Sequence, residues 1–287
     1  MSYFKFLEPK NLKEACELLS KHGEKAKLIA GGQSLVPLLT GRYIQPEYII
    51  DLKNLRELDY IKENKNYIKI GAMTTHRTLE TYPAIKKRFP VIVDAEHRIA
   101  HLQVRNWGTV GGALSHGDPG GDLFPPLIAL EAKVKTMSTR GEKEIPIDGF
   151  VVNIFTTVLE HDEILTEIIV PYSEPHSAAA YHKESIEEGD APIASVAAAI
   201  TLSEDGKTIK KARLVLGGVG ATPIIAEKAA KTLLGKKADD KTATEAGEVA
   251  MKEADPTADV LGSAEYKREI VRLLTRDMIL LAVKRAK

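Results

Sequence analysis

Two segments of the chain each place a pair of adjacent glycines beside a hydroxyl residue. The first is Gly31-Gly32, followed by Ser34, and the second is Gly111-Gly112, preceded by Thr109. Glycine permits a positive φ and lets main-chain N–H groups approach an anion without an intervening Cβ. A helix that starts directly after such a turn points its positive end at the same place. One pair alone is more typical of a plain tight turn, but two pairs favour a phosphate-bearing ligand.

We expect both glycine pairs to lie against phosphate. Valine at Gly32 or at Gly111 is therefore predicted to impair ligand binding more than folding, because a branched Cβ blocks the approach. Ser34 has two compatible roles, as the cap of the following helix or as a donor to a phosphate oxygen.

A polar, glycine-rich run from Ser115 to Asp122 follows the second pair. Its composition excludes a core strand and indicates either an ordered functional loop or a surface excursion. Asp122 directly precedes the apolar segment Leu123–Leu130, for which a helix is predicted. The Asp122 carboxylate could cap that helix, or accept a hydrogen bond from a ribose hydroxyl, and the two roles are compatible.

Hydrophobic periodicity predicts the elements that position these segments. An amphipathic helix is expected over Asn11–His22, a second helix from Leu35, and another from about Thr75. A βαβ-like unit is thus expected in the first fifty residues. Strands are predicted at Ala26–Ala30, Tyr48–Leu52, Tyr67–Ala72, Ala129–Thr136 and Glu163–Pro171.

The pattern changes after Pro171. Tyr172–His176 is interpreted as a linker. Strands at Ala194–Leu202 and Thr208–Leu216 flank Glu204-Asp205-Gly206, and Asp-Gly there predicts a hairpin with a type I′ turn. Alanine-, lysine- and glutamate-rich helices are expected to follow. We place a domain boundary near residue 175.

Composition limits the classes of function. Lys plus Arg and Asp plus Glu are 40 each, and this zero net charge argues against a nucleic-acid partner. The single cysteine, Cys16, excludes a disulfide framework and a cysteine-built metal cluster, and its helical spacing from Leu12 and Leu19 predicts a core position. No apolar run is long enough to span a membrane and no signal peptide is evident, so a cytoplasmic location is expected.

The two glycine segments together resemble those of a known family. Ala30-Gly31-Gly32-Gln33-Ser34 and Thr109-Val110-Gly111-Gly112 are similar to motifs of the FAD-binding medium subunits of molybdenum hydroxylases, such as aerobic carbon monoxide dehydrogenase, xanthine dehydrogenase and archaeal aldehyde or glyceraldehyde oxidoreductases. The likeness extends over nearly the whole chain, through Pro46–Leu52, Ile70–Thr75 and Gly218-Val219-Gly220.

The resemblance implies an α+β fold. Residues 1–175 would form a PCMH-type FAD-binding domain of two α/β subdomains, about 1–55 and 56–175. Residues 176–287 would form a small domain in which an antiparallel sheet packs against helices.

The resemblance also implies a set of FAD-binding residues. Leu28 to Leu35 and Thr109 to Ala113 would surround the diphosphate, Asp122 would bind the adenosine ribose, and Ile99 and Ala100 would pack against the flavin. Leu165 and Lys183 match positions that touch FAD from beyond the glycine segments, and a cation at Lys183 would stabilise reduced flavin. Without the match, Lys183 is interpreted as an ordinary surface lysine. The full set is Leu28, Ile29, Ala30, Gly31, Gly32, Gln33, Ser34, Leu35, Ile99, Ala100, Thr109, Val110, Gly111, Gly112, Ala113, Asp122, Leu165 and Lys183.

Two positions depart from the family pattern. Ala113 stands where many members carry asparagine, and Ala191 where many carry an aromatic ring after Gly-Asp. A backbone amide still serves at Ala113. The missing ring leaves the environment of the flavin open.

Three other patterns are weaker. His97 and His101 have the spacing of a zinc helix but lack its glutamate and a third ligand, and no metal site is predicted. His116 near Asp118 could suggest acid–base chemistry, but capping and loop hydrogen bonds are favoured. Gly217–Gly220 lacks a full nucleotide-binding spacing, which favours a turn.

The family resemblance implies one subunit of a heterotrimeric, cytoplasmic oxidoreductase. This chain would hold non-covalent FAD and no catalytic residue for hydroxylation. A large subunit would hold the molybdenum cofactor and a small one two [2Fe–2S] clusters, from which electrons would pass through FAD to an external acceptor. The alternatives are a self-sufficient FAD-dependent oxidase or reductase of the same fold and a flavin-free assembly or binding protein. No nucleic acid or membrane is expected as a partner.

Overall fold

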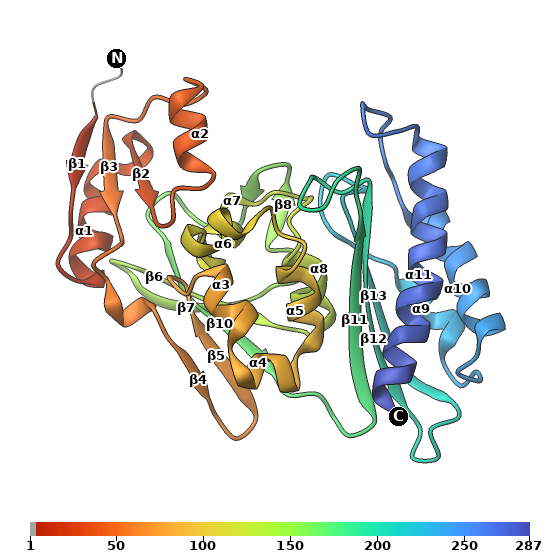
Figure 1. Ribbon diagram of the computed structural model, residues 1–287. Helices are drawn as coiled ribbons and strands as arrows, with labels where there is room; N and C mark the ends of the chain where they lie inside the picture. The colour runs from red at the N-terminus through yellow and green to blue at the C-terminus, as the bar shows by residue number, and fades with distance from the viewer. Residues whose placement is uncertain (1–3) are drawn as a thin grey trace.

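A three-stranded parallel sheet begins the fold in the computed structural model, which describes residues 4–287 (Figure 1). Its strand order is β1-β3-β2, with β1 at Lys5–Leu7, β2 at Ala26–Ile29 and β3 at Tyr48–Asp51. Helix α1 (Leu12–His22) buries Cys16 against the sheet, as its spacing predicts. The short helix α2 (Leu35–Thr40) follows β2 and completes the predicted βαβ-like unit. Two 3₁₀ turns, η1 and η2, lie at Gly23–Lys25 and Arg56–Leu58.

A five-stranded antiparallel sheet forms the centre of the molecule, in the order β4-β5-β10-β6-β7 (Figure 1). Short helices accompany this sheet, and Pro83 and Pro90 start two of them, because proline fits the first helical turn but not the interior. A small hairpin, β8–β9, lies beside them. The bounds are β4 Ile61–Glu63, β5 Tyr67–Gly71, α3 His76–Thr81, α4 Pro83–Arg88, α5 Pro90–Glu96, α6 Leu102–Trp107, α7 Val110–His116, α8 Phe124–Ala129, β6 Lys133–Ser138, β7 Gly141–Pro146, β8 Val151–Asn153, β9 Thr156–Thr157 and β10 Ile164–Pro171.

A four-stranded antiparallel sheet and three helices form the C-terminal part, which confirms the predicted α+β class. Figure 1 shows α9, α10 and α11 on the outer side of this sheet. No helix within residues 4–287 is long and apolar enough to cross a membrane. The bounds are β11 Ser177–Glu184, β12 Ala194–Leu202, β13 Ile209–Gly217, β14 Ile224–Ile225, α9 Glu227–Leu233, α10 Asp240–Glu253 and α11 Ala264–Ala286.

The four-stranded sheet contributes to two hydrophobic cores, because side chains alternate between its faces. Ala179 and Tyr181 of β11 belong to the core that contains α5 and α8, whereas Ala180 faces the core that contains α11. The last turn of α11 is tied back to α5 by an ion pair from Arg285 to Asp94, at 2.6 Å. Residue 175 lies between β10 and β11, and the division into two domains there stays a prediction.

Several elements differ from their sequence predictions. Ala129 ends helix α8, so strand β6 begins later than expected, at Lys133. The β12–β13 hairpin forms, but its turn is not type I′, because that type needs a positive φ at both central residues and only Gly206 has one here. Strands β1, β4, β7, β8, β9, β11 and β14 were not predicted.

The structure changes the expectation for Gly111. This glycine lies in the first turn of α7, and an added Cβ would come within 2.5 Å of Ala72 Cβ and 2.7 Å of Ala72 O. We therefore expect Gly111→Ala to lower the free energy of unfolding by about 1–3 kcal/mol through overpacking. Urea denaturation of the protein without added ligand measures this effect.

Gly206→Ala provides the control, because its Cβ meets open space and only its positive φ opposes the change. The expected cost there is about 1 kcal/mol. If Gly111→Ala were as stable as the parent, the contact with Ala72 would not explain the glycine.

Candidate functional site

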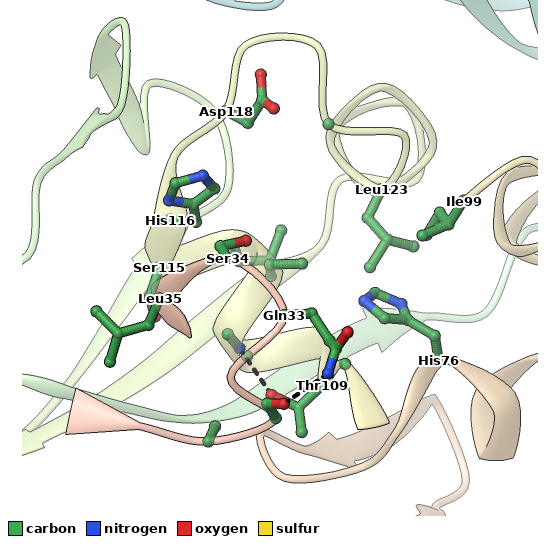
Figure 2. Close-up of a pocket in the computed structure, with 18 of the residues that line it drawn as sticks. Gln33, Ser34, Leu35, His76, Ile99, Thr109, Ser115, His116, Asp118 and Leu123 are labelled. Carbon is green, nitrogen blue, oxygen red and sulfur yellow. Dashed lines mark hydrogen bonds between the residues drawn. The ribbon is translucent and has the colours of Figure 1, made fainter. Parts of the chain in front are cut away.

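A cavity of about 860 Å³ lies where the predicted site residues converge. This volume is near the upper end of the range for small-molecule sites, roughly 300–1,000 Å³. The cavity is lined by the loop after β2, the start of α7, the loop before α6, the start of β10 and the end of β11. Figure 2 shows Gln33 of the first of these segments, Thr109 of the second and Ile99 of the third. Of the eighteen predicted residues, only Ile29 and Val110 do not line it, and Val110 points into the core instead.

The loop after β2 lines the cavity and has consecutive main-chain N–H groups without a protein partner in the described part of the chain. Within residues 4–287, the N–H groups of residues 31 to 35 have no protein acceptor, while Val36 already donates to Gly32 O. Ser34 makes no capping hydrogen bond, so its hydroxyl is also free for a ligand. A concave row of unpaired N–H groups binds anions.

Close packing explains the first glycine pair. A Cβ on Gly31 would lie 1.9 Å from Trp107 O, and Gly32 has a φ of +73°. Gly31 thus lets the loop pack against the end of α6, and Gly32 provides the left-handed turn that aims the amides. Gly32 thus adopts the positive φ that glycine permits, whereas Gly31 does not.

The second glycine pair is used differently, because its amides are satisfied within the protein. Gly111 N donates to Ala72 O at 2.9 Å, and Gly112 N donates to Thr109 Oγ1, which caps α7, at 3.1 Å. Neither glycine has a positive φ. The Thr109 hydroxyl hydrogen remains available to the cavity, as do the methyl group of Ala113 and the positive end of α7.

Asp122, Tyr181 and Lys183 form a buried network on the cavity wall. Lys183 Nζ lies 2.8 Å from Asp122 Oδ2, and Tyr181 Oη donates to Asp122 Oδ1 at 2.6 Å. Burial, together with the charge of Asp122, raises the pKa of Tyr181 well above its ordinary value, so the phenol keeps its proton. The interpretation of Lys183 as a surface lysine is wrong, since its side chain is 2% exposed. Helix capping by Asp122 is also wrong, because α8 has no side-chain cap.

The loop that carries Ile99 and Ala100 is held by cations. Lys183 Nζ donates to Arg98 O at 2.7 Å, and Arg105 donates to Ile99 O at 2.8 Å. Ala100 has a φ of +42°, a left-handed conformation that is costly for a non-glycine residue. Gly189 permits the loop, because a Cβ there would lie 2.4 Å from Ala100 O. Hydrogen bonds from Lys183 and Arg105, together with close packing by Gly189, therefore hold the two residues expected beside the flavin, Ile99 and Ala100.

Two further predicted positions lie on the cavity wall. Leu165 is buried near the start of β10, beside an irregularity in its pairing with β6. Ala191 also lines the cavity. His76 was not predicted, although it lines the cavity and its Nδ1 contacts Glu96. No local sequence pattern indicates this pair, because its two members lie on different helices.

The weaker sequence patterns have structural explanations. His97 and His101 do not share a helix, and His97 pairs with Glu80 at 2.8 Å. The His116 ring packs on Phe155, and Asp118 accepts a hydrogen bond from Gly120 N. Among residues 4–287 there is no group of three or more His, Cys, Asp or Glu that could hold a metal ion.

Comparison with known proteins gives matches over the whole length of the chain. Residues 2–173 match the FAD binding domain in molybdopterin dehydrogenase, and residues 179–282 match the CO dehydrogenase flavoprotein C-terminal domain. The chain is 36% identical to the carbon monoxide dehydrogenase medium chain of Hydrogenophaga pseudoflava, over 92% of this chain and 91% of that one. It is 37% identical to the nicotine 6-hydroxylase medium subunit of Paenarthrobacter nicotinovorans, over 96% and 95%. A solved carbon monoxide dehydrogenase from Hydrogenophaga pseudoflava aligns with a TM-score of 0.94 and 36% identity, over 99% of this chain and 98% of that one.

The buried ion pair makes a testable prediction about stability. Lys183→Met should lower the free energy of unfolding of the ligand-free protein by about 3–5 kcal/mol, because Asp122 is left buried without its cation. Adding Asp122→Asn should recover part of the loss, since it removes the unpaired charge. Urea denaturation of the two single variants and the double variant measures the coupling.

Lys267→Met is the matched control. Lys267 is similarly buried, but its partner Asp259 is 45% exposed and stays solvated when the lysine is removed. A loss at Lys183 no greater than that at Lys267 would contradict the importance of burial at Asp122.

Proposed function

The chain belongs to the family of FAD-binding medium subunits of the molybdenum hydroxylases, and from this premise we propose that it transfers electrons through FAD bound in the cavity described above. FAD, when bound, supplies redox chemistry that accepts electrons singly and releases them singly or in pairs. The single observation that carries the proposal is the row of free amides at residues 31–35, which faces the same cavity as Ile99, Asp122 and Lys183.

The residues present fit this cofactor. The free amides and the Ser34 hydroxyl supply donors for a diphosphate, and Thr109 adds a donor from the facing segment. Asp122 accepts one protein hydrogen bond on each carboxylate oxygen, which leaves a lone pair on each for a ribose hydroxyl. Ile99, Ala100 and Leu165 supply apolar surface for the flavin ring.

Lys183 is assigned a positioning role in this proposal. Its ammonium holds Asp122 and the carbonyl of Arg98, which leads into the Ile99-Ala100 loop. Because Asp122 neutralises the ammonium, its effect on the flavin potential is expected to be smaller than that of a free cation.

We assign hydroxylation to partner chains. A single cysteine cannot ligate a [2Fe–2S] cluster, which takes four protein ligands, and Cys16 contacts Met137 O rather than the cavity. We propose a heterotrimer in which a small iron–sulfur subunit delivers electrons to this chain and a large subunit holds the molybdenum cofactor. Hydroxylase and dehydrogenase subunits among the relatives support this assignment. The cytoplasmic location stays a prediction.

The alternative of a self-sufficient flavoenzyme is less well supported. The C-terminal part matches a carbon monoxide dehydrogenase domain, and its sheet packs on α5 and α8 rather than forming a separate substrate cap. In a flavin-free binding protein, neither the free amides nor the buried ion pair at the cavity would have a ligand to bind.

We predict that the purified protein takes up one non-covalent FAD per chain. Acid precipitation should release the yellow chromophore into the supernatant, with one adenine per flavin. Colour retained in the pellet would indicate a covalent link, for which His76 and His116 are the imidazoles that line the cavity. Failure to bind added FAD, or binding of FMN in its place, would contradict the diphosphate site.

We also predict that the chain alone lacks hydroxylase activity towards aldehydes, purines or carbon monoxide, because the required clusters have no ligands here. Activity should appear on co-expression with a large and a small partner, as a heterotrimer measured by size-exclusion chromatography. Turnover by the isolated chain would favour the self-sufficient flavoenzyme.

A further inference from the structure

His76 and Glu96 form a buried pair on the wall of the cavity. His76 is the first residue of α3 and Glu96 the last residue of α5. His76 Nδ1 lies 3.0 Å from Glu96 Oε2 and 3.2 Å from Oε1, and the two side chains are 5% and 0% exposed. A fully buried carboxylate needs a partner, and this imidazole is the partner that the fold provides.

The second nitrogen of His76 is available to a ligand. Nδ1 is occupied by Glu96, and no residue within 4–287 makes a hydrogen bond with Nε2. Gly108 makes room for the ring, because a Cβ there would come within 3.0 Å of His76 Cδ2. Figure 2 shows the ring beside Gln33 and Leu123, close to Ile99. His76 thus lines the same cavity as the free amides and the predicted flavin-contacting loop.

Glu96 determines the protonation of this ring. Burial opposes protonation of His76, but the charge and hydrogen bond of Glu96 outweigh it and raise the His76 pKa. Burial also raises the pKa of Glu96. Both shifts favour retention of a proton by the pair, as imidazolium with carboxylate or as imidazole with carboxylic acid. In both forms Nδ1 is committed to Glu96 and Nε2 carries a hydrogen.

Other charged groups surround the pair. Asp122, in the loop before α8, favours protonation of His76, and Arg105 on α6 opposes it. Glu80 on α3 favours retention of the proton by Glu96. Lys183 on β11 is neutralised by Asp122. Asp122 therefore raises the His76 pKa, as Glu96 does, and Glu80 raises the Glu96 pKa. Both neighbouring carboxylates favour retention of the proton by the pair.

We propose that His76 Nε2–H, held in place by Glu96, donates a hydrogen bond to an acceptor oxygen on the part of FAD that joins the flavin ring to the adenosine. This inference rests on the proposed FAD site. The acceptors there are diphosphate oxygens and ribityl hydroxyls. When the pair loses its proton, Nε2 no longer carries a hydrogen and cannot donate. FAD affinity therefore falls as the pH rises through the raised pKa of His76.

Two substitutions separate this role from a structural one. In His76→Asn, the side-chain amide nitrogen can take the place of Nδ1 and keep the contact with Glu96. The shorter side chain places no donor at the position of Nε2. Glutamine can place an amide N–H there and does not titrate. FAD titration of the apoprotein, followed by flavin fluorescence, should show about 10-fold or greater weakening in His76→Asn, the size expected for a hydrogen bond involving a charged group. His76→Gln should bind within a few-fold of wild type.

The pH profile gives a second measurement. Wild-type affinity should fall as the pH rises above the usual titration range of histidine, because the His76 pKa is raised, whereas His76→Gln should show a flat profile. His116→Gln should keep the wild-type profile, since His116, the other imidazole on the cavity wall, packs on Phe155.

ADP as a competing probe identifies the acceptor oxygen. Weaker ADP binding by His76→Asn than by wild type indicates the diphosphate, and unchanged ADP binding indicates the ribityl chain.

Equal FAD affinity of wild type, His76→Asn and His76→Gln would overturn this inference while leaving the FAD site intact. Equal weakening in both variants would also overturn it, because that result reflects structure rather than a donor. If His76→Asn does not fold, the wild-type and His116→Gln profiles decide: a flat wild-type profile overturns the inference. Failure of the wild-type protein to bind FAD would instead reject the proposed function.

Discussion

A charged amine enclosed between two parts of a protein must be neutralised where it lies, and this requirement organises the cavity. Lys183 enters from the end of β11, and its partner Asp122 comes from the loop before α8. The same ammonium binds the carbonyl of Arg98, so one cation fixes three separate segments of chain. Removing it would leave Asp122 without a cation, and the loop before α6 would keep its hydrogen bonds from Arg105 but lose the one at Arg98 O. The cavity thus keeps its shape through electrostatics as well as through apolar packing.

The amide row and the buried pairs have complementary properties. The loop after β2 is partly exposed and keeps its N–H groups unsatisfied, at an energetic cost that water or an anion offsets. Asp122, which lines the cavity, and Glu96, the partner of His76, are instead enclosed and already have partners. The polar groups at the cavity are therefore divided into unsatisfied donors and enclosed pairs. Such a division suits an elongated ligand with a charged middle and a flat, largely apolar end.

Local sequence signals predicted the glycine loop well and the rest of the site less well. A strand, two glycines and a helix determine the position of the amides within a few residues. Strand β11 was missed because its alanine-rich sequence has low strand propensity, although Tyr181 and Lys183 are two apart and so share a face. The packing of Gly111 on Ala72 was missed, because only tertiary structure brings these two residues together. Glu96 and His76 meet only when α3 and α5 pack together, and no spacing rule predicts that contact.

The sharing of one sheet between two cores has a consequence for synthesis. Domains form in order as a chain leaves the ribosome, and α5 and α8 are made well before β11, β12 and β13, whose Ala179, Tyr181, Ala197 and Val215 complete the same core. Until those strands emerge, Phe124 and Leu127 of α8 have an incomplete covering. The nascent chain therefore passes through an interval in which an apolar surface is open to aggregation or to a chaperone, and slower translation beyond residue 175 would lengthen it.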